Sequence, residues 1–271
     1  MHSLNLTIHN QENIIKEVLD RIKINSTGDY ELIIMIDGCT DRTEEYVDDF
    51  IKKNKQIRIK KLTAPNIFET KSNNIVAQNS SGDHIIIIHG DMLINELGWN
   101  ERILKPLFKF DDVFAVSARC SHNWELNPNS RHISEDFLRD DSWCDILNHI
   151  HHANKETFPD RDKFLIRSCV NRGPLAIDKK VFDFMGGFDE SFAPLDMDDH
   201  DLCYRVYKEL KKICGYYNID ITSDPNWGPT RENNITHGWA LKSNHKNTRT
   251  VHNRHKDIID SYQPTLERHC L

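Results

Sequence analysis

The chain has 271 residues, and its 35 Lys and Arg against 42 Asp and Glu give a formal net charge of −7. This charge argues against a general attraction to nucleic acid or to anionic membranes. Seven scattered cysteines without a CxxC pair indicate neither a zinc ribbon nor a disulfide framework. There is no signal-peptide pattern and no apolar run of the roughly 20 residues that a membrane span needs, so we expect a cytoplasmic protein without a membrane span.

Segments typical of strands and helices alternate along the first hundred residues. Each short apolar run is followed by apolar residues at helical spacing, as in βαβ units. The expected order is strand 4–8, helix 11–23, strand 30–36, a helix capped by Thr40 or Asp41, strand 57–62, helix 68–80 and strand 84–88. This order predicts a parallel, doubly wound sheet.

The alternation is looser in the second half. The expected elements are a strand at 113–118, an ordered segment at 169–177, a short helix at 179–185, an amphipathic helix with Leu202, Val206 and Leu210, and a strand at 216–221. Residues 121–161 are long and polar, which is typical of a variable lid or an acceptor-binding insertion. The tail from Pro225 is polar and His-rich and shows no convincing core pattern.

The stretch from His84 to Met92 holds four consecutive isoleucines, which predict a strand buried on both faces. His89 and Asp91 follow directly, where open α/β sheets bind their ligands. An imidazole and a carboxylate at this spacing can face one divalent cation on a diphosphate. The alternative is that Asp91 caps the next turn and His89 packs beneath it.

Four segments of the chain resemble the sequence signatures of the family-2 glycosyltransferases of the GT-A fold. They occur in the same order as in that family, and the resemblance covers residues 4 to 221. Three departures are visible: Ile36 and His89 stand where the family has an acid, and Cys39 stands where it has Ser. The matching segments are Thr7-Ile8-His9-Asn10-Gln11-Glu12, Asp37-Gly38-Cys39-Thr40-Asp41-Arg42-Thr43, Lys71-Ser72-Asn73-Asn74 leading into Ser81-Gly82 and His89-Gly90-Asp91, and Gly186-Gly187-Phe188-Asp189-Glu190 followed by Asp198-Asp199-His200-Asp201.

The resemblance implies roles on the donor side. Asp37 would accept the N3–H of a uracil-like base, with Thr7 lining the base, although an Asp at a strand end can also cap the next turn. Asp91 matches the second carboxylate of the DxD motif, which holds the metal on the diphosphate. His89 could still bond a ribose hydroxyl or ligate Mn²⁺. The other residues expected at the nucleotide sugar are Asn10, Lys71, Asn74 and Gly90.

The resemblance also implies a catalytic acid cluster on the acceptor side. Asp199 lies six residues before Arg205, the spacing of the family's acceptor-activating Asp. Its carboxylate, with Asp198 beside it, would take the acceptor's proton, and an in-line attack would invert the anomeric configuration. The alternative is that these acids only occupy a helix N-terminus, where the macrodipole favours them.

The His-rich tail is expected to supply further ligands. Relatives often bring a His or a basic residue from this region to the metal or the diphosphate, which points to Arg254 at the diphosphate and to His255 and His237 at the metal. A tail that simply faces solvent is the alternative.

The sequence therefore predicts an α/β protein with the GT-A fold, a Rossmann-like and mostly parallel central sheet flanked by helices. The expected domain spans 1–225, with a nucleotide-sugar half at 1–98 and an acceptor half at 99–225, and the tail at 226–271 closes over the site. The expected activity moves a sugar from a nucleotide sugar, UDP-linked as the first expectation, to a hydroxyl acceptor such as a glycan, with Mn²⁺ or Mg²⁺. The sequence leaves a homo-oligomer open.

Two alternatives stay open. The missing acids at Ile36 and His89 suggest a catalytically silent nucleotide- or sugar-binding protein of the same fold. A sugar-nucleotide-forming nucleotidyltransferase would need a Gly-rich phosphate loop after the first strand. Residues 8–13 contain no glycine, which argues against it.

Overall fold

The computed structural model describes residues 1–122, 144–147, 161–223, 227, 234–261 and 268–270. Most of the predicted insertion at 121–161 lies outside these residues. No helix within the described ranges is long and apolar enough to cross a membrane.

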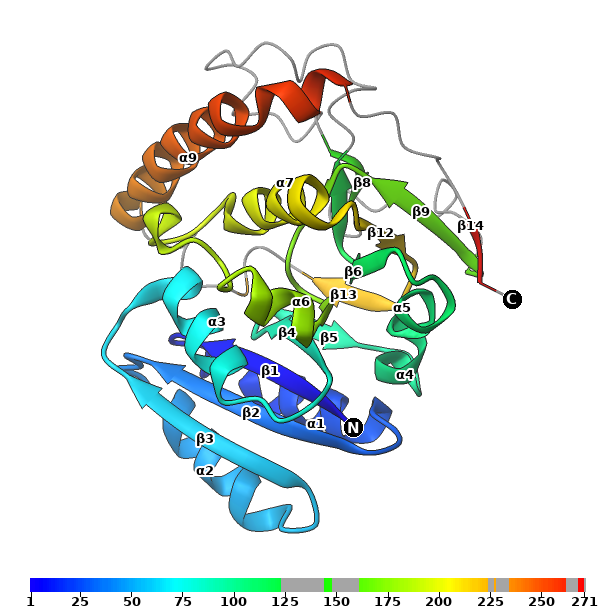
Figure 1. Ribbon diagram of the computed structural model, residues 1–271. Coiled ribbons are helices and arrows are strands. Elements are labelled where there is room, and N and C mark those ends of the chain that lie inside the picture. Colours follow the sequence, from blue (N-terminus) through cyan, green and yellow to red (C-terminus); the bar gives the residue numbers. More distant parts are fainter. Residues whose placement is uncertain (123–143, 148–160, 224–226, 228–233, 262–267, 271) are drawn as a thin grey trace.

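The first half alternates strands and helices as predicted (Figure 1). Three helices and four strands build it, followed by a short strand and two short helices. They are β1 (His2–Ile8), α1 (Ile15–Asn25), β2 (Tyr30–Asp37), α2 (Thr43–Lys53), β3 (Arg58–Ala64), α3 (Phe68–Gln78), β4 (His84–His89), β5 (Met92–Ile94), α4 (Trp99–Ile103) and α5 (Lys105–Lys109).

The second half mixes short strands with two longer helices. Its elements are β6 (Val113–Ser117), β7 (Cys120–His122), β8 (Cys144–Leu147), β9 (Lys163–Arg167), β10 (Cys169–Val170), β11 (Leu175–Asp178), α6 (Lys179–Phe184), the 3₁₀ turn η5 (Glu190–Phe192), α7 (Asp198–Leu210), β12 (Ile213–Tyr217), β13 (Ile221–Ser223), α9 (Asn234–Ser261) and β14 (Arg268–His269).

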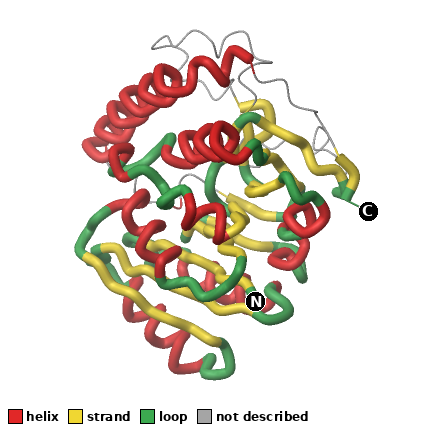
Figure 2. The backbone as a smooth tube through the Cα atoms, in the orientation of Figure 1, coloured by secondary structure: helices red, strands yellow, loops and turns green. Residues whose placement is uncertain are grey.

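One large sheet runs through both halves, in the order β14-β9-β12-β6-β11-β4-β1-β2-β3, with helices around it (Figure 2). The neighbours β4, β1, β2 and β3 are all parallel. β11 lies between β4 and β6 and is antiparallel to both. The expected α/β architecture with a mostly parallel central sheet is confirmed, and the antiparallel β11 joins its two halves.

The isoleucines of β4 divide between the two faces of the sheet. Ile86 and Ile88 pack with α1, α2 and β1 in one apolar core, whereas Ile85 and Ile87 pack with α6 and α7 in another. Successive side chains of a strand point to opposite faces, so an unbroken apolar run suits a strand covered on both sides. The prediction for this strand is confirmed.

The direction of β11 brings Arg172 to the functional edge. Because β11 is antiparallel to β4, its beginning lies beside the end of β4, and Leu175 pairs with Ile87. The residues before β11 therefore meet the residues after β4. A Cβ placed on Gly173, whose φ is +77°, would lie 3.0 Å from His89 Nδ1, so only glycine leaves room there.

The expectation of a tail without a core pattern is wrong. Helix α9 packs against α7, and its Val251, Ile258 and Ile259 are buried in the same core as α7 (Figure 1). These three apolar positions, seven and eight residues apart, form a sparse buried stripe that crosses a kink at His255. Within so polar a segment this stripe is too sparse to stand out in the sequence.

Two element boundaries also differ from expectation. The helix expected from residue 11 begins at Ile15, because Asn10 adopts a left-handed φ of 47° and Gln11 N donates to Thr43 Oγ1 at 2.7 Å. The strand expected at 216–221 is two strands, β12 and β13. The second of these leaves the main sheet to pair with β5.

Candidate functional site

The ends of β1, β2 and β4 lie side by side at one edge of the sheet. Thr7 pairs in register with Met35 of β2 and His89 of β4, and β2 ends at Asp37. Asp91 follows β4 at the same edge. Thr7, Asp37, His89 and Asp91, which were predicted to bind the nucleotide sugar, therefore share one edge of the sheet. This is the edge at which α/β sheets bind their ligands.

Asp91 carries a carboxylate oxygen without a partner. Its Oδ1 atom is buried and makes no hydrogen bond within the described part of the chain. A Cβ at Gly90 would overlap Gln11 Oε1, the end of a flexible side chain, which would have to move. A buried carboxylate oxygen without a donor is costly unless a ligand supplies its partner. Asp91 is therefore the residue best placed to meet a cation.

His89 is held by Glu69, a residue of α3 that the sequence analysis does not single out. His89 Nε2 lies 2.7 Å from Glu69 Oε1. Burial opposes the charged form of Glu69, but the charges of Arg172 and His89 outweigh it and hold the pKa of Glu69 well below its usual range. The imidazole of His89 thus faces a carboxylate on one side and Gly173 on the other. The only sequence signal was an acid two residues before Lys71.

Arg172 connects this edge to the acids of α7. Its Nε atom lies 3.2 Å from Glu69 Oε1, its Nη1 donates to Asp198 Oδ2 at 2.5 Å, and its backbone N donates to Asp199 Oδ2 at 3.0 Å. The guanidinium is buried, and the three carboxylates outweigh that burial and raise the pKa of Arg172 well above its usual value. A buried charge is stable only when it is paired in this way.

Both predicted catalytic acids lie in the first turn of α7. Asp199 Oδ1 accepts from His200 N at 2.9 Å, and Asp198 Oδ1 accepts from Asp199 N at 3.0 Å. Asp198 is fully buried and Asp199 is 4% exposed. They occupy the helix N-terminus, as the alternative supposed, and they also join the site through Arg172. Their catalytic role stays a prediction.

Asp196 is a further acid of this cluster. Asp196 and Met197 both adopt left-handed backbone angles, with φ of 71° and 69°. Burial raises the pKa of Asp196 to about 7, and the neighbouring carboxylates of Glu69, Asp199 and Asp198 add to the shift. An acid two residues before Asp198 is the only sequence signal that could have pointed to it.

Asp37 and Asn10, which were predicted to bind the nucleotide sugar, form hydrogen bonds within the protein at this edge. The carboxylate of Asp37 accepts from the backbone N of Ile67 at 2.8 Å and of Phe68 at 2.9 Å, which caps α3. Asn10 Oδ1 accepts from Thr40 N at 2.7 Å. The bonds of Asp37 cap the start of α3 and not the turn that directly follows β2, which was the alternative for this residue. Contact of either residue with a nucleotide stays a prediction.

Asn74 and Lys71 differ in their surroundings. Asn74 is buried, and its amide exchanges two hydrogen bonds of 2.9 Å with the backbone of Phe188. It therefore ties α3 to the Gly186–Glu190 segment. Lys71 is exposed on α3. A long cation at the surface can reach a diphosphate, whereas the amide of Asn74 is already engaged by the fold.

Arg254 and His255, which were predicted from the tail, contact Asp189 and Asp201. Arg254 Nη1 donates to Asp189 Oδ2 at 2.7 Å and to Asp201 Oδ1 at 2.8 Å. His255 Nε2 lies 2.8 Å from Asp201 Oδ1. The side chain of His237 lies outside the described residues. The contacts that the structure gives to Arg254 and His255 are with acids other than Asp91, and their predicted roles at the metal or diphosphate stay predictions.

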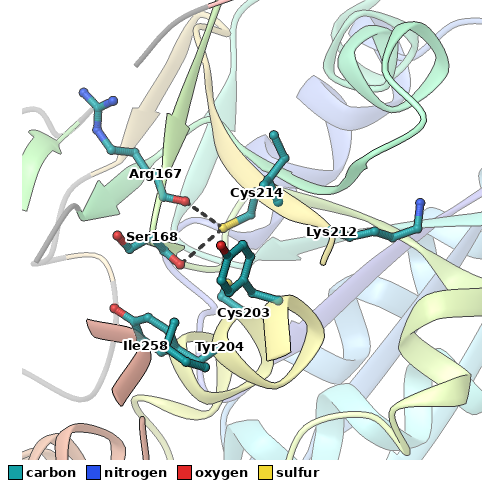
Figure 3. Close-up of a pocket in the computed structure, with 9 residues that line it drawn as sticks. Arg167, Ser168, Cys203, Tyr204, Lys212, Cys214 and Ile258 are labelled. Carbon is teal, nitrogen blue, oxygen red and sulfur yellow. Dashed lines mark hydrogen bonds between the residues drawn. The ribbon is translucent and has the colours of Figure 1, made fainter. Parts of the chain in front are cut away.

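A small pocket opens elsewhere, between α7, β12 and α9 (Figure 3). Cys203 and Tyr204 of α7, Cys214 of β12 and Ile258 of α9 line it. Cys214 Sγ donates to the carbonyl of Arg167 at 3.3 Å. None of its lining residues belongs to the predicted donor or acceptor sites, so this pocket lies apart from them.

The comparison with protein families decides the assignment. The model of glycosyl transferase family 2 matches residues 3–172, more than half of the chain. The chain belongs to glycosyl transferase family 2. Among curated proteins no sequence matches it significantly. The matched region includes β1, β2 and β4, together with His89, Asp91 and Arg172.

Solved structures of glycosyltransferases share the fold of this family-2 member. A mannosyltransferase from Pyrobaculum calidifontis, in complex with GDP-Man and Mn²⁺, is 15% identical with a TM-score of 0.61, over 97% of this chain and 65% of that chain. Glucosyl-3-phosphoglycerate synthase from Mycobacterium tuberculosis, in complex with Mn²⁺, UDP and glucosyl-3-phosphoglycerate, is 16% identical with a TM-score of 0.58, over 94% of this chain and 80% of that one.

GalNAc-T7, in complex with UDP, GalNAc and Mn²⁺, is 12% identical with a TM-score of 0.61, over 82% of this chain and 43% of that chain. The chain spans less than two thirds of the length of the mannosyltransferase and of GalNAc-T7. At these identities the likeness shows the GT-A fold, and it confirms the predicted fold of this family-2 chain.

Replacing Asp198 by Asn should destabilise the protein. The change leaves Arg172 buried with one partner fewer, and breaking a buried ion pair costs about 3 kcal/mol or more. Urea denaturation measures the loss in unfolding free energy. The matched control is Asp183→Asn on α6, whose carboxylate is 52% exposed and pairs with Lys179, and it should change stability by less than about 0.5 kcal/mol. Equal effects of the two variants would contradict the buried network.

Replacing Asp196 by Asn should stabilise the protein at high pH only. An acid whose pKa is raised in the folded state contributes stability below its unfolded pKa and loses it as pH rises through about 7. Allowing for partial solvent access, Asp196→Asn should raise the unfolding free energy by about 2 kcal/mol at pH 8 and by almost nothing at pH 4. Thermal unfolding across this range measures the difference, and a pH-independent effect would argue against a raised pKa.

Proposed function

We propose that this chain transfers a sugar from a nucleotide sugar, with a UDP-sugar as the first candidate, to a hydroxyl acceptor such as a glycan, with inversion at the anomeric carbon. The observation that carries the proposal is the buried, unpartnered carboxylate oxygen of Asp91 at the carboxyl edge of the sheet. The structural relatives that were solved with GDP-Man or UDP support it. The cytoplasmic location, the homo-oligomer and the boundaries at 98 and 225 stay predictions.

The residues at this edge fit a divalent cation. Carboxylate oxygens are the ligands that Mg²⁺ and Mn²⁺ prefer, and Asp91 Oδ1 has no donor of its own. No cluster of three or more His, Cys, Asp or Glu ligands occurs in the described ranges, so we expect Asp91 to hold the ion together with diphosphate oxygens. His89 would stand beside it, oriented by Glu69. Such an ion, when bound, neutralises the charge that develops on the departing diphosphate.

Asp199 would act as the proton acceptor. Its carboxylate is held in place by Arg172 N and His200 N, so little reorganisation is needed during reaction. The acceptor hydroxyl gives its proton to Asp199 while its oxygen forms a bond to the anomeric carbon. The bond from that carbon to the diphosphate breaks on the opposite face, which inverts the configuration.

A second candidate function is that of a silent nucleotide-binding protein. The observation favouring it is that Glu69 lies 2.7 Å from His89 Nε2, so the position where the family has an acid holds an imidazole in contact with another side chain. Such a protein would bind a nucleotide sugar without turning it over. Donor hydrolysis distinguishes the two functions, because an active transferase uses water slowly in place of the acceptor.

Replacing Asp91 by Ala should remove metal-dependent nucleotide binding. With Mn²⁺ present, a nucleotide sugar at about 100 times its Kd should stabilise the wild type by about 2.7 kcal/mol. A thermal-shift panel of UDP-, GDP-, CMP- and dTDP-sugars, with and without Mn²⁺, measures this and identifies the base. The control is Asp83→Asn, an exposed acid just before the opposite end of β4, which should behave as the wild type. If no nucleotide stabilises the folded wild type, the proposed function is wrong.

Replacing Asp199 by Asn should lower donor hydrolysis while nucleotide binding is retained. Loss of a general base costs about 10²-fold to 10⁴-fold in rate. Proton NMR of the hydrolysis measures the rate, and it also reports which anomer appears first, which should be inverted relative to the donor. Asp183→Asn is again the control. Unchanged hydrolysis in Asp199→Asn would reject this residue as the base, and a retained anomer would reject inversion.

A further inference from the structure

Helix α9 brackets the segment that carries the catalytic acids. This segment runs from Asp189 through η5 into the first turn of α7. Arg254 donates to Asp189 at its beginning and to Asp201 at its end, and His255 also contacts Asp201. The C-terminal helix therefore contacts both ends of the stretch that contains Asp198 and Asp199.

Asn247 of α9 holds the middle of this stretch. Its side chain is buried, 2% exposed, and its Nδ2 donates to the backbone carbonyls of Phe192 at 2.8 Å, Leu195 at 2.9 Å and Asp196 at 3.1 Å. The two hydrogens of one amide thus serve three carbonyls, one from the last residue of η5 and two from the loop that follows it. From the other side, the backbone N of Thr70 in α3 donates to the carbonyl of Pro194 at 3.3 Å.

The backbone at this point needs such support. Asp196 and Met197 are consecutive non-glycine residues with left-handed φ angles. L-residues disfavour this conformation, and it persists where surrounding contacts determine it. It turns the chain directly into Asp198 and Asp199, whose carboxylates then meet Arg172. The amide of Asn247 is bonded to the residue where this turn begins.

We propose that Asn247 is a positioning residue that, through residues 192–196, fixes the placement of Asp198 and Asp199 on the acceptor side of the site. This inference rests on the proposed function for its catalytic consequence. Asn247 bonds to the backbone carbonyls of 192, 195 and 196, whereas the expected nucleotide site is built from the ends of β1, β2 and β4. Loss of the amide should therefore affect proton acceptance and leave donor binding intact.

The test compares Asn247→Asp, which keeps the shape and replaces the donor by an oxygen facing three carbonyl oxygens, with Asn247→Ala, which only removes the amide. The matched control is Arg249→Ala, an exposed residue of the same helix. Hydrogen–deuterium exchange of a peptide covering 190–203 measures how well the backbone of this segment is held in place. Titration with UDP and Mn²⁺ measures the Kd for UDP, and UDP-sugar hydrolysis measures kcat and KM.

In Asn247→Asp we expect exchange in 190–203 at least about tenfold faster than in wild type, kcat about tenfold lower, and Kd for UDP and KM for the donor unchanged. Asn247→Ala should change the same quantities in the same direction, and it takes over the test if Asn247→Asp does not fold. Arg249→Ala should match the wild type.

Unchanged exchange or unchanged kcat in both Asn247 variants would overturn the positioning role. A parallel loss of UDP binding would overturn it as well, because it would show a general structural effect. If the wild type binds none of the nucleotides in the panel and hydrolyses none of their sugars, the proposed function fails, and the exchange measurement still decides whether Asn247 holds the segment.

Discussion

The arrangement of charged residues in the site depends on the ion pairs of the buried Arg172 guanidinium. The guanidinium reaches Glu69, and through it His89, on one side and Asp198 on the other, and the backbone N of the same residue donates to Asp199. A charge in such a place is tolerated only with its partners present, since removing one partner costs several kcal/mol. The carboxyl edge of the sheet and the first turn of α7 are therefore linked by one ion-pair network.

The sequence predicted the helices and strands that are marked by the pattern of apolar residues within one short segment. Four isoleucines before His89 and Asp91 mark a strand buried on both faces, and the structure shows Ile85 and Ile86 in different cores. The order of strands and helices in the first half follows equally from apolar spacing. The unpartnered oxygen of Asp91 agrees with the role that its motif position implies.

The sequence could not predict contacts between residues far apart in the chain. Glu69 and Arg172 are about a hundred positions apart, and only the antiparallel direction of β11 brings them together. The two oxygens of Asp37 accept the backbone N–H groups of Ile67 and Phe68 at the start of α3, a contact between distant parts of the chain that no local pattern shows. The buried stripe of α9 was missed because Val251 and Ile258 are too widely spaced in a polar segment to show a period.

The position of Arg172 in the chain matters for how such a protein can be recombined. The family match ends at this residue, whereas its acidic partners on α7 lie beyond the matched region. A chimera that joined residues 3–172 to the remaining part of another relative would inherit Arg172 and Glu69 without the acids of α7. Unless the incoming half brings acids to the same place, the junction would bury a cation against foreign side chains. Exchange of the segment after residue 172 between relatives is thus restricted by one ion-pair network.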